Sequence, residues 1–255
     1  MGKNVSIAQI KAHLFAEQRP SVDWVNALRA DERKGVQQLL VRYDRILERE
    51  AQLIQQFRDM RAFEKTFSFS GAQIAGVDEV GRGPLAGPVT AVAVILPERF
   101  ELPGLTDSKK LTSEQRARFY EEITAAADVG IGTATSDEID EINIYQASRR
   151  AMVRAVEALA NRPDHLAVDA MELPLDIPQT PLIKGDAKSA SIAAASVVAK
   201  VTRDTYMKTL HESYPAYRFN ENAGYGTKAH LEALDREGPS PEHRRSFQPV
   251  ITREA

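Results

Sequence analysis

Four acidic residues stand just past short apolar runs in the second part of the chain. Asp78 and Glu79 follow the first of these runs. Asp169 and Asp186 follow two later ones. If the runs are strands whose ends meet at one edge of a sheet, the four carboxylates form a single acidic cluster. Carboxylates crowded in this way repel one another, so they ionise together only when a cation is present. The pattern therefore suggests a divalent-metal hydrolase.

Glycines and one exposed aromatic residue add features of a phosphate or sugar site. Gly81, Arg82 and Gly83 follow the first acidic pair. Glycines let the backbone approach a ligand and present N–H donors to it, and Arg82 supplies a charge suited to phosphate. Tyr225 lies between two glycines, so we expect its ring to be free to stack on a base or a sugar. Taken singly, each acid is also typical of a turn or a helix cap.

Several basic residues are further candidates for phosphate contacts. Two of them, Lys109 and Lys110, precede a helix start, where phosphate binding is physically easy. A solvated side chain is the default for each of them, so the sequence leaves open which of them contact a ligand. The candidates are Lys109, Lys110, Lys184, Lys188, Arg244 and Arg245.

The composition excludes other classes of site. The 255-residue chain has no cysteine, which rules out disulfides, thiolate zinc sites and cysteine nucleophiles. Its five histidines are scattered without HExxH-type pairing, which argues against a histidine-rich zinc site. No apolar run approaches the roughly 20 residues of a membrane helix, and the N-terminus lacks a signal-peptide profile. We therefore expect a cytoplasmic protein.

Hydrophobic periodicity divides the chain into two parts. Residues 1–70 are expected to form a helical extension, in which Ser6 and Ser21 begin two short helices and a long amphipathic helix starts near Asp31. Residues 71–255 are expected to form an α/β domain with a mixed sheet. The expected strands are 74–77, 89–96, 129–133, 166–169 and a run near 182–183, and the expected helices are 112–127, 144–160, 191–201 and 227–238.

The charge is unevenly distributed between these parts. Residues 1–70 contain 12 Lys and Arg against nine Asp and Glu, which leaves 21 against 27 for the rest of the chain. Solvated helix faces explain this asymmetry most simply, and an arm that binds nucleic acid is the alternative.

Six sequence blocks resemble the ordered motifs of type 2 ribonuclease H, the bacterial ribonuclease HII family. The resemblance covers roughly residues 72–250 and does not extend to the helical extension. The blocks are Asp78-Glu-Val-Gly-Arg-Gly-Pro, Asp107-Ser-Lys-Lys-Leu, Asp137-Glu-Ile-Asp-Glu-Ile-Asn143, Lys184-Gly-Asp-Ala-Lys-Ser, Ala194-Ala-Ser-Val-Val-Ala-Lys200 and His243-Arg-Arg-Ser-Phe247.

The resemblance implies a ribonuclease-H-like sheet flanked by helices and the cleavage of RNA in RNA–DNA hybrids. It also implies cleavage on the 5′ side of single ribonucleotides in duplex DNA. In such a protein the four acids hold two Mg²⁺ or Mn²⁺ ions, and the products carry 5′-phosphate and 3′-hydroxyl ends. The Gly81–Gly83 element and Tyr225 then contact the ribose 2′-hydroxyl and its neighbours, and Lys109, Lys110, Lys184 and Lys188 are candidates to hold phosphates.

Three alternatives stay open at this point. A nuclease similar to ribonuclease HIII prefers longer RNA tracts, but that relative carries a β-sheet where this chain is expected to be helical. A non-catalytic hybrid-binding module is expected to have lost an acid. A small-molecule phosphoesterase has no need of Tyr225. The expected partners are RNA–DNA hybrids and ribonucleotide-containing DNA, with neither a membrane nor an obligate protein partner.

Overall fold

The computed structural model describes residues 5–67, 69 and 71–253. By contacts between residues, the chain separates into two compact units, Met1–Gln56 and Phe57–Ala255. The expected domain boundary at residue 70 lies outside the described residues. None of the helices in the described part of the chain has the length and apolarity needed to cross a bilayer.

The first unit contains the predicted helices α1 (Ile7–Leu14) and α2 (Val22–Leu28) and most of α3 (Lys34–Glu64). Ser6 caps α1 in a capping box with Gln9, and Ser21 caps α2 by accepting the Trp24 N–H. Because the apolar residues recur at helical spacing, each helix buries one stripe. The buried side chains are Ile10, Leu14, Val25, Leu28, Val36, Leu40 and Tyr43.

The second unit is built on a five-stranded mixed sheet with the order β3-β2-β1-β4-β5. The strands are β1 (Ile74–Val80), β2 (Val89–Ile95), β3 (Asp128–Ala134), β4 (His165–Asp169) and β5 (Gln179–Leu182). Strands β1, β4 and β5 are parallel, whereas β2 runs antiparallel to both β1 and β3. The predicted mixed sheet is confirmed.

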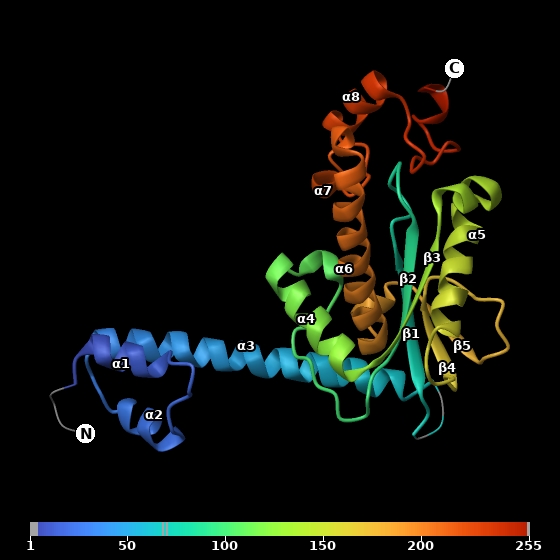
Figure 1. The fold of residues 1–255 in the computed structure, drawn as a ribbon. Coiled ribbons are helices and arrows are strands. Elements are labelled where there is room, and N and C mark those ends of the chain that lie inside the picture. The colour runs from blue at the N-terminus through green and yellow to red at the C-terminus, as the bar shows by residue number, and fades with distance from the viewer. Residues whose placement is uncertain (1–4, 68, 70, 254–255) are drawn as a thin grey trace. The chain divides into compact units, whose positions relative to one another are not determined.

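Helices cover both faces of this sheet (Figure 1). On one face lie α4 (Ser113–Ala126) and α6 (Ala190–Ser213), and on the other lies α5 (Ser136–Glu157). The side chains of β2 alternate between the two cores: Val92 packs with α4 and α6, and Ala93 packs with α5. At Gly76 of β1 a Cβ atom would lie 2.2 Å from the backbone nitrogen of Ile192, so only glycine allows α6 to pass this close.

Several elements differ from the predicted ranges. Helix α6 continues to Ser213 instead of ending near residue 201, and β5 covers Gln179–Leu182 instead of a run near 182–183. Strand β1 continues to Val80, so Asp78 and Glu79 lie within it and pair with Val92 and Ala91 of β2. Helix α5 begins at Ser136 and is interrupted at Asn143, which has a φ of 67°. The Asn143 side chain accepts the N–H groups of the two residues that start the second half, so the predicted helix over 144–160 corresponds to that half alone.

Short helices complete the second unit. These are the 3₁₀ helices η1 (Ser108–Lys110), η2 (Gly185–Ala187), η3 (Pro215–Tyr217) and η4 (Ile251–Arg253), and the α-helices α7 (Phe219–Asn222) and α8 (Lys228–Glu237). Helix α8 is capped by Thr227 and ends at Gly238, as its sequence predicts.

Candidate active site

The four predicted acids come from neighbouring elements at one edge of the sheet. Because β1, β4 and β5 are parallel, their carboxyl ends lie at the same edge. Asp78 and Glu79 lie in the last part of β1, Asp169 ends β4, and Asp186 lies in η2 just past β5. Asp169 is their common neighbour, since its negative charge raises the pKa of each of the other three.

Asp78 is the most deeply buried of the four, with 8% of its surface exposed. Its Oδ1 accepts the Glu79 N–H at 2.8 Å. Burial raises the pKa of Asp78 well above its ordinary value, and the charges of Glu79 and Asp169 raise it further. A hydrogen bond from Ser196 of α6 acts in the opposite direction. Burial and the neighbouring carboxylates therefore disfavour the charged form of Asp78, and positive charge close to it would favour that form.

Glu79 has one carboxylate oxygen with a partner and one without. Arg82 Nη1 lies 3.3 Å from Glu79 Oε1. The buried Oε2 atom makes no hydrogen bond. Burial raises the pKa of Glu79 to about 7 even though the Arg82 charge lowers it. A buried oxygen of this kind is costly unless it meets a hydrogen-bond donor or a cation.

A hydrogen bond joins Asp169, at the end of β4, to η2, which contains Asp186. Asp169 Oδ1 accepts the backbone N–H of Gly185 at 2.8 Å, which fixes η2 against the end of β4. The pKa of Asp186 is raised, first by burial and then by the charges of Asp107 and Asp169. Lys109 and Lys110 of η1 lower it. Asp107, which belongs to one of the six sequence blocks but was not predicted as a site residue, is thus a fifth acid at this edge.

The donor set suits a hard divalent cation. Within the parts of the chain that the structure describes, no three His, Asp or Glu side chains are placed to hold a metal ion as they stand. All the groups concerned are nevertheless carboxylates, which are the ligands that Mg²⁺ and Mn²⁺ prefer. The partnerless Glu79 Oε2 and the raised pKa values of Asp78 and Asp186 are features that a nearby cation would relieve.

Two buried arginines hold the loop over residues 81–88, which begins with Gly81, Arg82 and Gly83. Arg203 of α6 donates through Nε to the Pro88 carbonyl at 2.9 Å. Arg244 donates through Nη1 to the Arg82 carbonyl at 2.8 Å and through Nε to the Gly87 carbonyl at 3.0 Å. Burial lowers the pKa of Arg203 to about 10 and that of Arg244 to about 9, so both are charged at neutral pH. Their hydrogen bonds hold the backbone carbonyl groups of this loop, whereas the Arg82 side chain is exposed.

Gly81 allows Arg203 to approach the backbone of the turn closely. The residue has a φ of 91°, which favours glycine, and a Cβ atom there would lie 2.2 Å from Arg203 Nε. Arg244 was predicted only as a solvated cation or a phosphate ligand. It is fully buried, so its ligands are the carbonyl groups of the turn.

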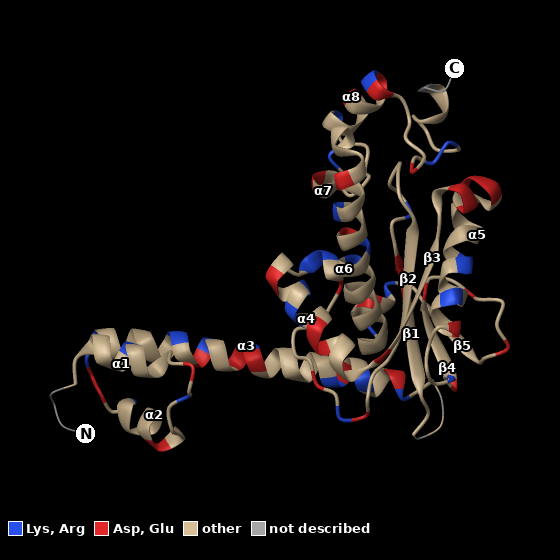
Figure 2. Cartoon of the chain, in the orientation of Figure 1, with Lys and Arg blue, Asp and Glu red and all other residues tan. Residues whose placement is uncertain are grey.

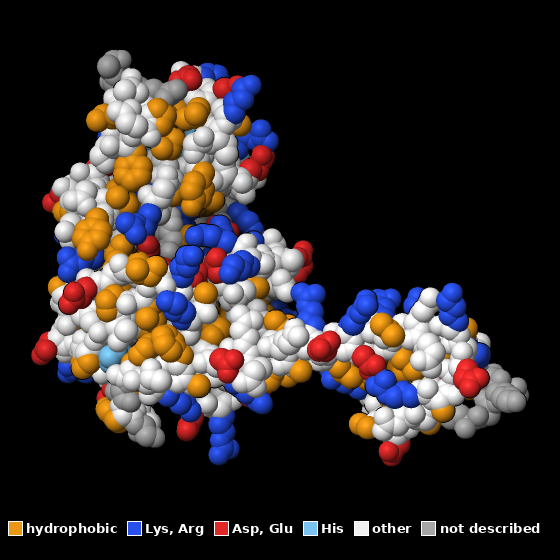
Figure 3. All heavy atoms as spheres, turned by 180° about the vertical axis from the view of Figure 1, so that it is seen from behind, with side chains coloured by type: hydrophobic (Ala, Val, Ile, Leu, Met, Phe, Trp, Pro, Cys, Tyr) orange, Lys and Arg blue, Asp and Glu red, His pale blue; other side chains and the backbone are white. Residues whose placement is uncertain are grey.

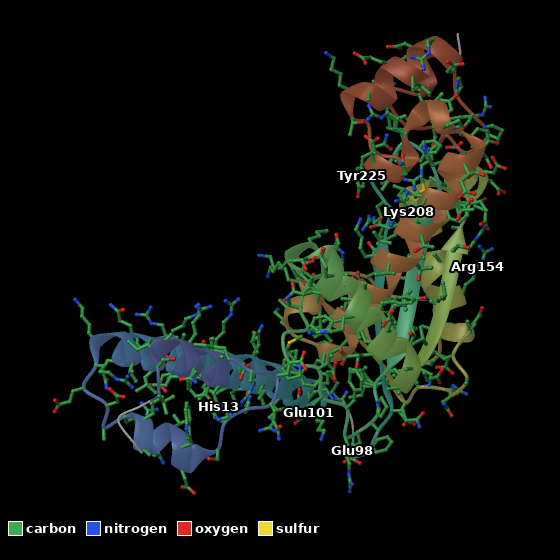
Figure 4. All side chains as sticks on the ribbon, turned by 60° about the vertical axis from the view of Figure 1, so that its left-hand side comes forward. His13, Glu98, Glu101, Arg154, Lys208 and Tyr225 are labelled. Carbon is green, nitrogen blue, oxygen red and sulfur yellow. The ribbon has the colours of Figure 1, made fainter. Side chains whose placement is uncertain are left out.

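Tyr225 lies beside this turn. Figure 4 labels its position on the ribbon. Its side chain is 45% exposed. A Cβ atom at Gly83 would lie 3.6 Å from Tyr225 Cε1, so the ring edge faces the glycine turn. The Leu85 N–H donates to the Gly224 carbonyl at 2.8 Å, which ties the two loops together. The structure therefore brings the glycine turn and the predicted aromatic contact together.

A hydrogen-bonded chain of two histidines reaches the backbone of Tyr225. His243 Nδ1 accepts the Ser240 N–H at 3.0 Å, so this nitrogen carries no proton. In neutral His243 the proton is then on Nε2, which lies 2.9 Å from His230 Nε2. His230 Nε2 is the acceptor, and His230 Nδ1 donates to the Tyr225 carbonyl at 2.9 Å. The partners thus select one tautomer of each neutral ring.

Comparison with known proteins places this arrangement in a family. The model described as Ribonuclease HII matches residues 75–250, and the model described as Ribonuclease HII N-terminal domain matches residues 6–68. Ribonuclease HII of Lactobacillus gasseri is 55% identical over 247 residues, which are 96% of this chain and 98% of that protein. The chain belongs to the ribonuclease HII family. Ribonuclease HII of Halalkalibacterium halodurans is 53% identical over 256 residues, covering 98% of this chain and 96% of that protein.

The ribonuclease HII fold of this chain is also similar to solved structures. The ribonuclease H2 of Pyrococcus horikoshii matches with a TM-score of 0.61 and 26% identity, over 71% of this chain and 97% of that one. Bst-RNase HIII in complex with Mn2+ matches with a TM-score of 0.57 and 16% identity, over 76% of this chain and 72% of that one, which shows the fold alone. The predicted family and fold class are confirmed. The chain is a ribonuclease H-type endonuclease for RNA in RNA–DNA hybrids.

Two of the sequence blocks meet where the first half of α5 contacts the C-terminal segment. Asp140, in the acidic first half of α5 that Figure 2 shows in red, accepts the N–H groups of Arg245 and Ser246 at 2.8 and 2.9 Å. The Ser136 hydroxyl donates to the Glu242 carbonyl at 2.7 Å. These contacts seat the segment that carries His243 and Arg244, so both blocks support the glycine turn and Tyr225 indirectly.

The predicted lysines fall into two groups. Lys109 and Lys110 act electrostatically on Asp186. Lys184 and Lys188 are exposed and form no ion pair with any described residue. Figure 3 shows Lys and Arg side chains gathered beside acidic ones in the middle of one face of the second unit.

Proposed function

We propose that the chain cuts the RNA strand of RNA–DNA hybrids and also cuts on the 5′ side of single ribonucleotides in duplex DNA. Residues 71–255 are the catalytic domain in this proposal, and residues 1–70 are a helical extension. The products carry 5′-phosphate and 3′-hydroxyl ends. The observation that carries the proposal is the exposed Tyr225 ring against Gly83, on the turn that follows the acidic pair of β1.

Asp78, Glu79, Asp169 and Asp186 are the proposed ligands of two divalent cations, Mg²⁺ or Mn²⁺. The support is the carboxylate donor set, the partnerless Glu79 Oε2 and the raised pKa values at the site. When bound, such ions supply the positive charge that lets these acids ionise together and that stabilises charge on a reacting phosphate. Asp169 also holds Gly185, so it positions Asp186 in addition to offering an oxygen.

Recognition of the ribonucleotide is assigned to the glycine turn and Tyr225. The exposed Arg82 offers a guanidinium to a phosphate, and the glycines present backbone groups to the 2′-hydroxyl. The Tyr225 ring is free to pack against the next sugar. Lys109, Lys110, Lys184 and Lys188 are the proposed phosphate contacts around the site.

The alternative of a ribonuclease HIII-like enzyme is the less favoured one. The described residues 5–67 form helices and contain no strand. The same region matches the N-terminal domain model of ribonuclease HII. A non-catalytic binding module is disfavoured because all four acids are present and gathered at one edge.

The test uses three duplexes that differ only in their sugars: one ribonucleotide in DNA, four consecutive ribonucleotides in DNA, and DNA alone. We expect cleavage 5′ of the single ribonucleotide, cleavage within the tract and no cleavage of DNA, all dependent on Mg²⁺ or Mn²⁺. Asp78→Asn serves as the inactive control. Cleavage of the tract without cleavage of the single ribonucleotide would favour the ribonuclease HIII-like alternative.

A further inference from the structure

The outward face of α3 in the first unit carries cations that form no ion pair with a carboxylate among the described residues. Its inward side is buried at Val36, Leu40 and Tyr43. The opposite side is exposed and bounds a shallow depression of about 590 Å³. Its lining includes Lys34, Val41, Arg42, Arg45, Ile46 and Arg49, and no Asp or Glu is among the residues that form it. We call Lys34, Arg42, Arg45 and Arg49 the basic face of α3.

The other arginines of this unit behave differently. Arg19 pairs with Glu50, Arg29 with Asp44 and Arg33 with Asp31. Among the described residues, none of the four cations of the basic face forms an ion pair. Arg42 instead lies over the Phe15 ring, with its Cζ 5.0 Å from the ring centroid. The other arginines of the unit are paired with carboxylates, so the unpaired positive charge lies on the basic face of α3.

The spacing of these cations suits an extended polyanion. With a rise of 1.5 Å per residue, the face from Lys34 to Arg49 is about 22 Å long. A nucleic-acid duplex carries one negative charge per roughly 1.7 Å of its axis, so several phosphates lie within that length. Nitrogen-tipped side chains project from one side of the first unit in Figure 4. The four side chains are exposed, so they can reach phosphates without rearrangement of the core.

We propose that the basic face of α3 binds the phosphate backbone of a nucleic-acid duplex, without reading its sequence or its sugars. The inference rests on the proposed function in one respect, since the duplex it binds is the substrate. An anionic membrane surface fits less well, because Val41 and Ile46 are the only aliphatic side chains of the depression and do not form the broad apolar face of a membrane helix.

The test measures binding of the full-length protein to an all-DNA duplex, which is not cut, over a range of salt concentrations. Arg42, Arg45 and Arg49 are changed together to Gln. Each phosphate contact contributes about 0.9 to the slope of log affinity against log salt. Losing three contacts should lower the slope by about 2.7, so between 50 and 200 mM salt the variant should lose about 40-fold less affinity than the wild type.

The matched control changes Arg19, Arg29 and Arg33 to Gln. It removes the same charge from the same unit, but from arginines that are already paired, so we expect the wild-type slope. An equal change of slope in both variants, or no change in either, overturns the proposal. Binding of the wild type to phosphatidylserine vesicles that is lost in the first variant, with duplex binding unchanged, overturns it in favour of a membrane surface.

Cleavage separates this inference from the proposed function. With saturating hybrid, the first variant should cut the same bonds as the wild type, because contacts to phosphate carry no information about the sugar. If the wild type fails to cut a single-ribonucleotide duplex, the proposed function fails whatever the salt slope. If the wild type cuts and the slopes are equal, only the duplex-binding face is rejected.

Discussion

His230 and His243 lie with their Nε2 atoms 2.9 Å apart, and both rings are buried. Two protonated rings cannot face each other in this way, because each Nε2 would then carry a hydrogen. Burial lowers the pKa of both, and His230 and Arg245 lower that of His243 further, to about 4. The folded state therefore holds both rings neutral at pH 7. Protonation of both rings breaks the Nε2–Nε2 hydrogen bond, whereas the Nδ1–H of His230 still donates to the Tyr225 carbonyl.

We predict that the pair makes the fold sensitive to acid. Both histidines have a lower pKa in the folded chain than the unfolded value of about 6.5. The unfolded chain thus binds more protons below pH 6.5, and stability falls between pH 6.5 and about 4. The contribution of His243 is on the order of 3 kcal/mol, from a pKa that falls from 6.5 to about 4. Urea unfolding at several pH values measures it.

The control for this prediction is His243→Gln. This variant should be less stable than the wild type at pH 8, because His230 Nε2 loses its buried donor, a loss of about 1–3 kcal/mol. Its stability should also fall less steeply between pH 6.5 and 4. A wild-type stability that is flat over this interval would show that the two rings are not held neutral by the fold.

Asp78→Asn is predicted to abolish cleavage while leaving duplex binding largely intact. Asp78 is a proposed cation ligand, and an amide lacks the charge that a divalent cation requires. The loss should exceed tenfold in Mg²⁺, since removing a metal from a hydrolytic site costs several kcal/mol of barrier lowering. Single-turnover cleavage and binding to an uncleaved duplex are measured side by side. Asp186→Asn should be milder, and a variant Asp78→Asn that keeps more than a tenth of the rate contradicts the assigned role.

Local signals in the sequence were sufficient for much of the fold. Ser6 was predicted only to begin a helix, and in the structure it caps α1 in a capping box with Gln9. Thr112 with Gln115 has the sequence pattern of a capping box, and this box is present at the start of α4. A third box, Thr135 with Glu138, begins α5 but was not recognised in the sequence. Each box depends on residues three apart, so it can be identified without any knowledge of the tertiary structure.

Contacts between distant parts of the chain could not be predicted from the sequence. The pairing of β1 with β2 continues past the apolar run, so Asp78 and Glu79 lie inside a strand whose end looked like a turn. Arg244 has the sequence appearance of a surface cation, yet carbonyl groups more than 150 positions away make it a buried one. Strand extension and buried charge are both set by tertiary partners, which periodicity does not report.

The last turns of α3 belong structurally with the sheet, which leads to a prediction about truncation. Phe57 and Met60 are buried in the core that α4 and α6 share. Glu64 Oε1 accepts from the Ser189 hydroxyl and the Ser191 N–H, both at 2.6 Å, at the start of α6. A chain beginning at residue 57 should fold, whereas one beginning at residue 71 should be destabilised by more than the roughly 3–5 kcal/mol typical of losing one buried Phe. Urea unfolding of both chains measures this, with Glu64→Gln as a milder variant. Equal stability of the two truncated chains would contradict it.

Tyr225→Ala is predicted to reduce cleavage of single-ribonucleotide DNA more than cleavage of continuous hybrids. At an isolated ribonucleotide the next sugar is a deoxyribose, against which the exposed ring packs closely. In an RNA tract another 2′-hydroxyl occupies that place, so less stacking is available to lose. Stacking worth about 1–3 kcal/mol corresponds to a drop of roughly 5- to 150-fold on the first substrate.

The measurement for Tyr225→Ala is kcat/KM of variant over wild type on both duplexes at one salt concentration. Tyr225→Phe keeps the ring and should stay close to the wild type in the stacking component. Equal losses on both duplexes for Tyr225→Ala would assign the ring to general substrate binding, and the distinction between sugars would then depend on the backbone at Gly81 and Gly83.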